Sequence, residues 1–118
     1  MKLLTQAIKK KLPPLYAQDG KEGEAIVHVK YFTPDAQWSW LVYEGEPVKD
    51  ENDQVIDYVF FGLVIGHEKE LGYFHLSELE KVRGSLGLPI ERDLYFKPTP
   101  IYELVPEMFV EPQMKGGD

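Results

Sequence analysis

The strongest hydrophobic pattern in the chain is an unbroken apolar run at residues 58–65, YVFFGLVI. A half-buried strand alternates apolar with polar positions, whereas a strand covered on both faces is apolar throughout. The run therefore predicts a strand that is central in its sheet, with odd- and even-numbered residues on opposite faces. Gly62 interrupts the run, and a glycine in mid-strand marks a bulge or the close approach of another group. We expect a large aromatic side chain over it.

A second strand and a helix are predicted directly after this run. Residues 67–70 are charged and suit a tight turn, and residues 71–76 return as an antiparallel strand. Ser77 and Glu80 have the S-x-x-E spacing of a helix-capping box. Gly84 stands where a left-handed C-terminal cap belongs. We therefore expect a helix of about seven residues between Ser77 and Gly84.

Two more strands are predicted upstream, at residues 25–32 and 38–44, because both segments alternate and are rich in β-branched and aromatic residues. The residues expected to share a face are Val27, Val29 and Tyr31 in the first strand, and Trp38, Trp40 and Val42 in the second. Residues 46–54 are charged and contain a proline, which favours a mobile loop between strands.

The two ends of the chain have weaker patterns. Apolar residues spaced by four predict a short helix at residues 5–11, which Pro13 and Pro14 end. After Gly84, residues 94–97 suit a short strand, and four prolines beyond them exclude long regular elements. We expect this segment to wrap the core in an extended form. Its anchors would be Tyr95, Phe96, Ile101, Tyr102 and Leu104.

These elements predict an α+β fold. Its sheet would be a twisted antiparallel meander of four to five strands, with short N-terminal and mid-chain helices and an extended proline-rich C-terminal segment. The length of 118 residues suits a single domain, which we place at residues 1–112, with a flexible tail at residues 113–118.

Composition excludes several classes of function. The chain has no cysteine, so disulfide frameworks, thiolate metal sites and cysteine nucleophiles are excluded. The first residues are too charged for a signal peptide, and no apolar run reaches the length of a membrane span. We expect a cytoplasmic protein with no membrane partner.

The net charge of -7 is concentrated in one segment. Residues 44–57 hold six acids against Lys49 alone, and these acids are Glu44, Glu46, Asp50, Glu51, Asp53 and Asp57. The N-terminal 30 residues have the opposite balance, with a lysine cluster at Lys9, Lys10 and Lys11. An acidic domain is a poor general ligand for phosphate backbones, so the charge disfavours nucleic acid as the partner.

No complete catalytic or metal-binding motif is present. The segment HEKEL at residues 67–71 lacks the second histidine of the zinc protease motif H-E-x-x-H, because Leu71 stands there. Glu91 and Asp93 flank Arg92, a pattern that suits paired carboxylates but is more typical of a structural ion pair. The glycines match no phosphate-binding loop. We expect no catalytic residue, no metal site and no cofactor.

Four blocks together resemble a family of small bacterial proteins classed as a domain of unknown function. The blocks are KKLPPLYA, KYFTPDAQWSW, FFGLVIGHEKELGYFHLSELE and RGSLGLPIERDLYFKP, and the resemblance spans residues 3 to about 98. Members are often carried on plasmids, conjugative elements and phages, near genes for antirestriction and DNA-processing proteins. The resemblance implies an accessory role on mobile DNA, and it assigns no role to any residue.

Three functional hypotheses follow. The leading one is a non-enzymatic protein-interaction module whose six acids contact a basic partner, such as a DNA-processing or host-defence protein. The second is nucleic-acid binding through the lysine cluster and the sheet aromatics Trp38 and Trp40. The third is a metal-dependent hydrolase that uses Glu68, Glu70, Glu91 or Asp93. The positions of the two tryptophan rings distinguish plain core packing from a binding groove.

Overall fold

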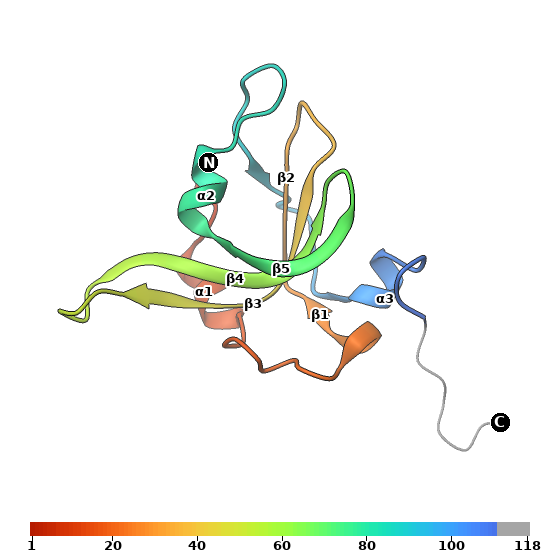
Figure 1. Cartoon of the computed structure of the whole chain (residues 1–118), viewed down its shortest axis with the longest axis horizontal. Helices are drawn as coiled ribbons and strands as arrows, with labels where there is room; N and C mark the ends of the chain where they lie inside the picture. Colours follow the sequence, from red (N-terminus) through yellow and green to blue (C-terminus); the bar gives the residue numbers. More distant parts are fainter. Residues whose placement is uncertain (111–118) are drawn as a thin grey trace.

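The computed structural model of the chain describes residues 1–110 and has the predicted α+β fold (Figure 1). Its helices are α1 (Gln6–Lys11), α2 (Leu76–Lys81) and α3 (Ile101–Leu104), with a 3-10 helix η1 (Glu22–Glu24). Its strands are β1 (Ile26–Val27), β2 (Val29–Phe32), β3 (Ser39–Lys49), β4 (Val55–Ile65), β5 (Lys69–His75), β6 (Glu91–Arg92) and β7 (Thr99–Pro100). The flexible tail expected at residues 113–118 lies outside the described residues.

The main sheet has five antiparallel strands in the order β5-β4-β3-β2-β6. Strands β2 to β5 follow one another as the predicted meander, because short turns can join only neighbouring antiparallel strands. Strand β6 returns along the outer edge of β2, and β1 leaves the sheet to pair with β7. The antiparallel sheet expected from the sequence is confirmed.

The apolar run at residues 58–65 lies in β4, which pairs with β3 on one side and β5 on the other. Phe60 and Leu63 are fully buried, and they belong to two different apolar clusters on opposite faces of the sheet. The prediction of a strand covered on both faces is therefore confirmed. The closest group to Gly62 is the backbone of β3 and not the expected aromatic ring. A Cβ added there would collide with the carbonyl oxygen of Leu41 in β3.

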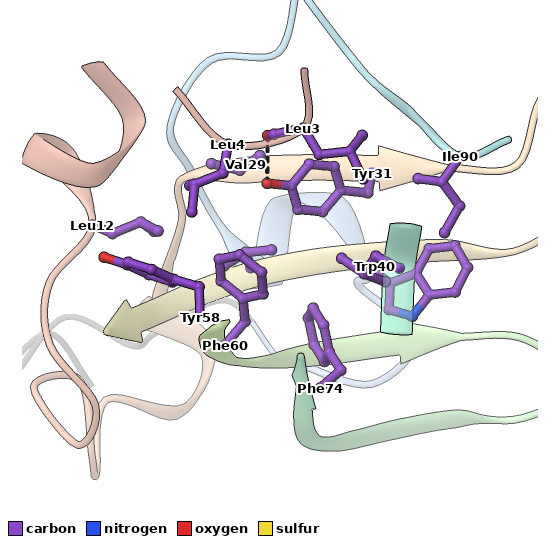
Figure 2. Close-up of a cluster of buried hydrophobic side chains, with 12 residues drawn as sticks. Leu3, Leu4, Leu12, Val29, Tyr31, Trp40, Tyr58, Phe60, Phe74 and Ile90 are labelled. Carbon is purple, nitrogen blue, oxygen red and sulfur yellow. Dashed lines mark hydrogen bonds between the residues drawn. The ribbon is translucent and has the colours of Figure 1, made fainter. Parts of the chain in front are cut away.

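The first cluster lies between the sheet, α1, α2 and the N-terminal residues (Figure 2). The rings of Tyr31 and Phe60 lie 6.0 Å apart, and the Tyr31 hydroxyl donates a 2.7 Å hydrogen bond to the carbonyl oxygen of Leu3. Leu79 is the buried residue of α2 and joins this cluster. Burial of the Tyr31 ring raises the pKa of its hydroxyl, so this hydrogen-bond donor stays neutral.

The second cluster covers the other face and uses the C-terminal segment. Val27, Tyr43 and Leu63 pack there against Ile101 of α3 and Val105. The segment after β6 differs from its prediction. Residues 94–97 form no strand, and Tyr95 is almost fully exposed instead of anchoring the chain. Phe96 and Ile101 do pack on the core as expected.

The predicted strand at residues 25–32 is broken at His28. The backbone N–H of His28 donates to the carbonyl oxygen of Val42, and β1 then turns away to pair with β7. As a result Val27 joins the second cluster, whereas Val29 and Tyr31 join the first. The prediction that these three residues share a face was wrong, because alternation within one strand does not reveal a change of partner strand.

The loop predicted at residues 46–54 is mostly strand. Strand β3 continues to Lys49 and β4 begins at Val55, so the two strands form a long hairpin (Figure 1). Only residues 50–54 form its turn. The register shifts twice along this hairpin, between Val42 and Glu44 and between Val48 and Lys49. The charged residues and the proline suggested a loop, but residues 46–49 pair with residues 55–59 of β4 instead.

Helix α2 was placed correctly, but both of its predicted ends were wrong. His75 precedes the first turn, and the Glu78 carboxylate accepts a 3.0 Å hydrogen bond from the backbone N–H of His75. Ser77 lies inside the first turn and Glu80 takes no part in the cap. The helix ends before Val82, and Gly84 has no left-handed φ. None of the helices among residues 1–110 is long and apolar enough to span a membrane.

Candidate functional site

The β3–β4 hairpin extends beyond the rest of the sheet and ends in an exposed turn (Figure 1). We define the hairpin tip as residues 49–56. It carries three of the six predicted acids, Asp50, Glu51 and Asp53, and beside them two adjacent apolar side chains. These are Val55 and Ile56, which are 57% and 62% exposed. An apolar pair next to a carboxylate cluster is suited to contact with a protein partner.

The turn of the hairpin tip is ordered by its own side chains. One carboxylate oxygen of Asp50 accepts hydrogen bonds from the backbone N–H of Asn52 at 2.8 Å and of Gln54 at 2.9 Å. Asp53 adopts a left-handed φ of 63°, a conformation that aspartate tolerates better than most residues. Its carboxylate lies 3.5 Å from the Lys49 ammonium. The turn of the tip is therefore defined by hydrogen bonds and an ion pair among its own residues.

Glu44 and Glu46, two more of the predicted acids, are used inside the molecule. The Glu44 carboxylate, only 2% exposed, accepts hydrogen bonds from the backbone N–H of Tyr16 at 2.9 Å and of Gln18 at 2.6 Å. Glu46 accepts one from the N–H of Leu15 at 3.1 Å. Both acids fasten the loop after α1 to β3. The burial of Glu44 contradicts the prediction that it presents its charge to a partner, whereas Glu46 is half-buried.

The register shift in β3 explains the orientation of Glu44. Val42 pairs with Gly62 and Glu44 pairs with Phe61, so Tyr43 is an extra residue in β3. This bulge reverses the alternation and turns Glu44 away from the first cluster, toward residues 16–18. Gly45 then faces Phe60 and Tyr58, where an added Cβ would lie 2.9 Å from the Phe60 ring.

Asp57, the sixth predicted acid, caps helix α2. It accepts a 2.6 Å hydrogen bond from the Ser77 hydroxyl and a 3.1 Å hydrogen bond from the Ser77 backbone N–H. The latter satisfies one of the donors that a helix leaves unpaired in its first turn. Desolvation raises the pKa of Asp57, but the hydrogen bonds from Ser77 and Tyr58 outweigh it, and the pKa lies below its usual value.

The two tryptophans occupy different environments at the opposite end of the sheet from the hairpin tip. Trp40 is buried in the first cluster, whereas Trp38 is 36% exposed and stacks on it with a ring separation of 6.0 Å. Two hollows flank Trp38. One of about 360 Å³ is lined by Val82 and Arg83 among others, and one of about 300 Å³ by His67, Glu68 and others. The Trp38 side chain therefore lines both hollows, whereas the Trp40 side chain belongs to the first cluster.

The residues proposed for nucleic-acid binding are not brought together. The ammonium of Lys9 lies 6.0 Å from the centre of the Tyr58 ring, at one end of the run in β4. Trp38 lies beside Gly66, just past the other end of β4. A strand rises 3.2–3.4 Å per residue, so the backbone from Tyr58 to Gly66 spans about 25 Å. Trp40 is buried and offers no stacking surface.

The carboxylates proposed for a hydrolase are also far apart. Glu68 and Glu70 belong to the β4–β5 turn and to β5, while Glu91 and Asp93 lie in or beside β6. Strands β5 and β6 are the opposite edges of the five-stranded sheet. Within residues 1–110 no three His, Asp or Glu side chains are placed to hold a metal ion. The structure therefore contradicts a joint site built from these carboxylates.

Sequence reasoning missed the contribution of Val55 and Ile56. It treated residues 44–57 as a charged segment, although two β-branched residues between acids are a strand signal. It also missed Asp35, whose carboxylate accepts hydrogen bonds from the backbone N–H of Leu86 at 2.7 Å and of Leu88 at 3.1 Å. This contact, across about 50 residues of chain, fixes the 84–88 loop beside Trp38.

Comparison with protein families agrees with the resemblance seen in the sequence. Residues 3–104 match the family model described as a protein of unknown function, DUF2958. The chain belongs to the DUF2958 family. The matched residues of this DUF2958 protein include both helices α1 and α2, the hairpin tip and all five strands of the main sheet. No curated protein and no solved structure matches the chain.

Proposed function

We propose that this DUF2958 protein is a non-enzymatic, cytoplasmic interaction module that uses its hairpin tip to bind a basic protein. One observation carries the proposal. The exposed pair Val55 and Ile56 stands on a projecting, ordered hairpin, beside the exposed acids Glu51 and Asp53. As the resemblance implies, the protein acts as an accessory of mobile genetic elements, and its partner is a DNA-processing or host-defence protein.

The two kinds of side chain at the hairpin tip have different tasks in such a contact. Burial of Val55 and Ile56 against a partner would remove apolar surface from water, at about 25 cal/mol for each Å² buried. The carboxylates steer a basic partner toward the tip, and their attraction weakens as salt rises. The tip also gives up little conformational freedom on binding, because the Asp50 hydrogen bonds already fix its turn.

The test is affinity purification from the native host with matched variants. Glu51→Lys/Asp53→Lys reverses the charge of the tip, and Val55→Thr/Ile56→Thr removes apolar surface while it keeps β-branched side chains. Glu24→Lys/Glu103→Lys makes the same charge change at two exposed acids elsewhere. We expect both tip variants to lose most of the partner that the wild type and the control retain. Equal recovery by all four proteins would contradict the proposal.

Nucleic-acid binding is tested in the same series. Lys10→Glu/Lys11→Glu reverses two exposed charges on α1. If the protein binds partner proteins through the hairpin tip, this variant recovers them as the wild type does, and neither protein retains single-stranded or duplex DNA at low salt. Salt-sensitive DNA binding that this variant abolishes would favour the nucleic-acid alternative over the hairpin tip.

A further inference from the structure

Strand β5 is an edge strand with an open outer side. Its inner side pairs with β4 through seven residue pairs in unbroken register, from Val59–His75 to Ile65–Lys69. Among residues 1–110 no strand pairs with its outer side. Natural edge strands are usually protected from further pairing by a proline, a bulge or a charge. β5 has no proline or bulge, its only lysine, Lys69, is bound to Glu107 at 3.1 Å, and the acidic charge on this strand is the Glu70 carboxylate.

One face of β5 forms an apolar ledge. Leu71 and Tyr73 point to the side of the second cluster and are 46% and 53% exposed. The Tyr73 ring packs on the Phe61 ring, with 4.9 Å between the ring centres. The ledge is therefore held in place. It lies where alternate side chains of an added strand would rest.

The other face of β5 borders the hollow of about 300 Å³ beside Trp38, to which Glu68 and Glu70 contribute. The Trp38 ring stacks on Trp40 and makes a T-shaped contact with the His67 ring, with 5.7 Å between the ring centres. No ion pair engages Glu68 or Glu70 in the part of the chain that the structure describes. Two carboxylates that have no ion pair, next to an indole ring, form a suitable binding site for a cationic side chain.

We propose that the outer edge of β5 binds an extended segment of a partner protein as a sixth strand, with one lysine or arginine flanked by apolar residues. The cationic side chain enters the hollow beside Trp38 and Glu70, because a residue paired with Glu70 points to the same face. Its two neighbours, opposite Lys69 and Leu71, point to the other face, and the one opposite Leu71 also reaches Tyr73 diagonally. Backbone hydrogen bonds to β5 supply the rest of the affinity. This surface is separate from the hairpin tip.

A second copy of the chain fits this edge less well. The side chains that β5 presents on the face of the hollow are Glu70 and Phe74, with Gly72 between them. A copy paired through β5 would therefore bring a carboxylate or a phenyl ring to the hollow, and no cation. Lys69 faces the other side of the sheet. Charge complementarity thus favours a basic partner segment over self-pairing.

The proposal is tested by titrating the full ¹⁵N-labelled chain with a capped eight-residue peptide, Ser-Thr-Val-Lys-Val-Thr-Val-Ser. We expect backbone shifts at residues 67–75 and a shift of the Trp38 indole N–H. Two further peptides are N-methylated at alternate amides. The peptide methylated at the amides that face β5 should bind at least about tenfold more weakly, whereas the other should bind like the unmodified peptide. Absence of shifts, or equal losses of affinity for both methylated peptides, would overturn the proposal.

Matched protein variants test the hollow. Glu68→Gln/Glu70→Gln should weaken binding of the lysine peptide about tenfold and leave a norleucine peptide unaffected, whereas Glu24→Gln/Glu103→Gln should change neither. Equal affinity of the two glutamate double variants for the lysine peptide would contradict the charged hollow. Concentration-dependent self-association that Leu71→Asp abolishes would overturn the proposal in favour of a β5–β5 dimer. The Glu51→Lys/Asp53→Lys variant should bind the peptide normally, which separates this surface from the hairpin tip.

Discussion

At the scale of single residues, six acids that look alike in the sequence have three different tasks. Glu44 and Glu46 fasten a loop, Asp57 caps a helix, and only Asp50, Glu51 and Asp53 stand on the hairpin tip. The sequence identified the acidic segment but could not show which of its acids have which task. The donor that binds Glu44 most closely, the N–H of Gln18, lies 26 positions away in the chain, and local spacing contains no record of such a contact.

The Glu44 site gives a stability prediction. In Glu44→Gln the new amide group would direct an N–H toward a backbone N–H of Tyr16 or Gln18, and one buried donor would lose its acceptor. We expect the free energy of unfolding to fall by about 2 kcal/mol. Chemical denaturation measures it. Glu51→Gln on the exposed tip is the control and should change it by less than about 0.5 kcal/mol. Equal effects of the two substitutions would contradict the role of Glu44.

Asp57 gives a pH prediction. Its folded-state pKa lies below its ordinary value of 3.8, so the ionised carboxylate contributes stability that is fully present above about pH 4. The contribution is lost as the pH falls through the folded-state pKa. The difference in unfolding free energy between wild type and Asp57→Asn should therefore be largest near neutral pH and shrink below about pH 4. Asp53→Asn is the exposed control. A difference that stays constant down to pH 2 would be inconsistent with an ionised cap.

At the scale of elements, sequence patterns predicted both β4 and helix α2. The cap of α2, however, depends on a residue from another element. The apolar run predicted a strand covered on both faces, and β4 is one. The S-x-x-E pattern placed α2 within a residue or two, but the cap is formed by His75 and Glu78, with Asp57 from β4. A cap contributed by another strand cannot be predicted from neighbouring positions.

A pair of glycines tests the packing of β4. Gly62 and Gly72 are directly paired across β4 and β5. A Cβ at Gly62 would lie 1.9 Å from the Leu41 carbonyl oxygen, whereas one at Gly72 would have no atom within 4 Å. Gly62→Ala should therefore lower the free energy of unfolding by about 3 kcal/mol, because a backbone atom of β3 would have to move. Thermal or chemical unfolding measures it, and Gly72→Ala should be neutral or slightly stabilising. Similar values for the two variants would contradict the close approach of β3 to Gly62.

At the scale of the whole molecule, the antiparallel meander places its two candidate surfaces apart. The hairpin tip is at one end of β3 and β4, and Trp38 with the adjoining edge of β5 is at the other. The order of strands followed from short connections in the sequence. The addition of β6 beyond β2 and the pairing of β1 with β7 did not. Both bring together segments about 60 to 75 residues apart, and the two-residue strands involved have no periodicity to detect.

The most direct test of the hairpin tip as the contact surface is site-specific photo-crosslinking in the native host. A benzophenone side chain at Ile56 should give a discrete crosslinked partner band. The same group at Leu86, an exposed apolar residue on the 84–88 loop, should not give that band. Addition of Glu51→Lys/Asp53→Lys to the Ile56 probe should remove it. A band that survives the charge reversal, or that is equally strong from Leu86, would contradict the hairpin tip as the surface that binds a basic partner.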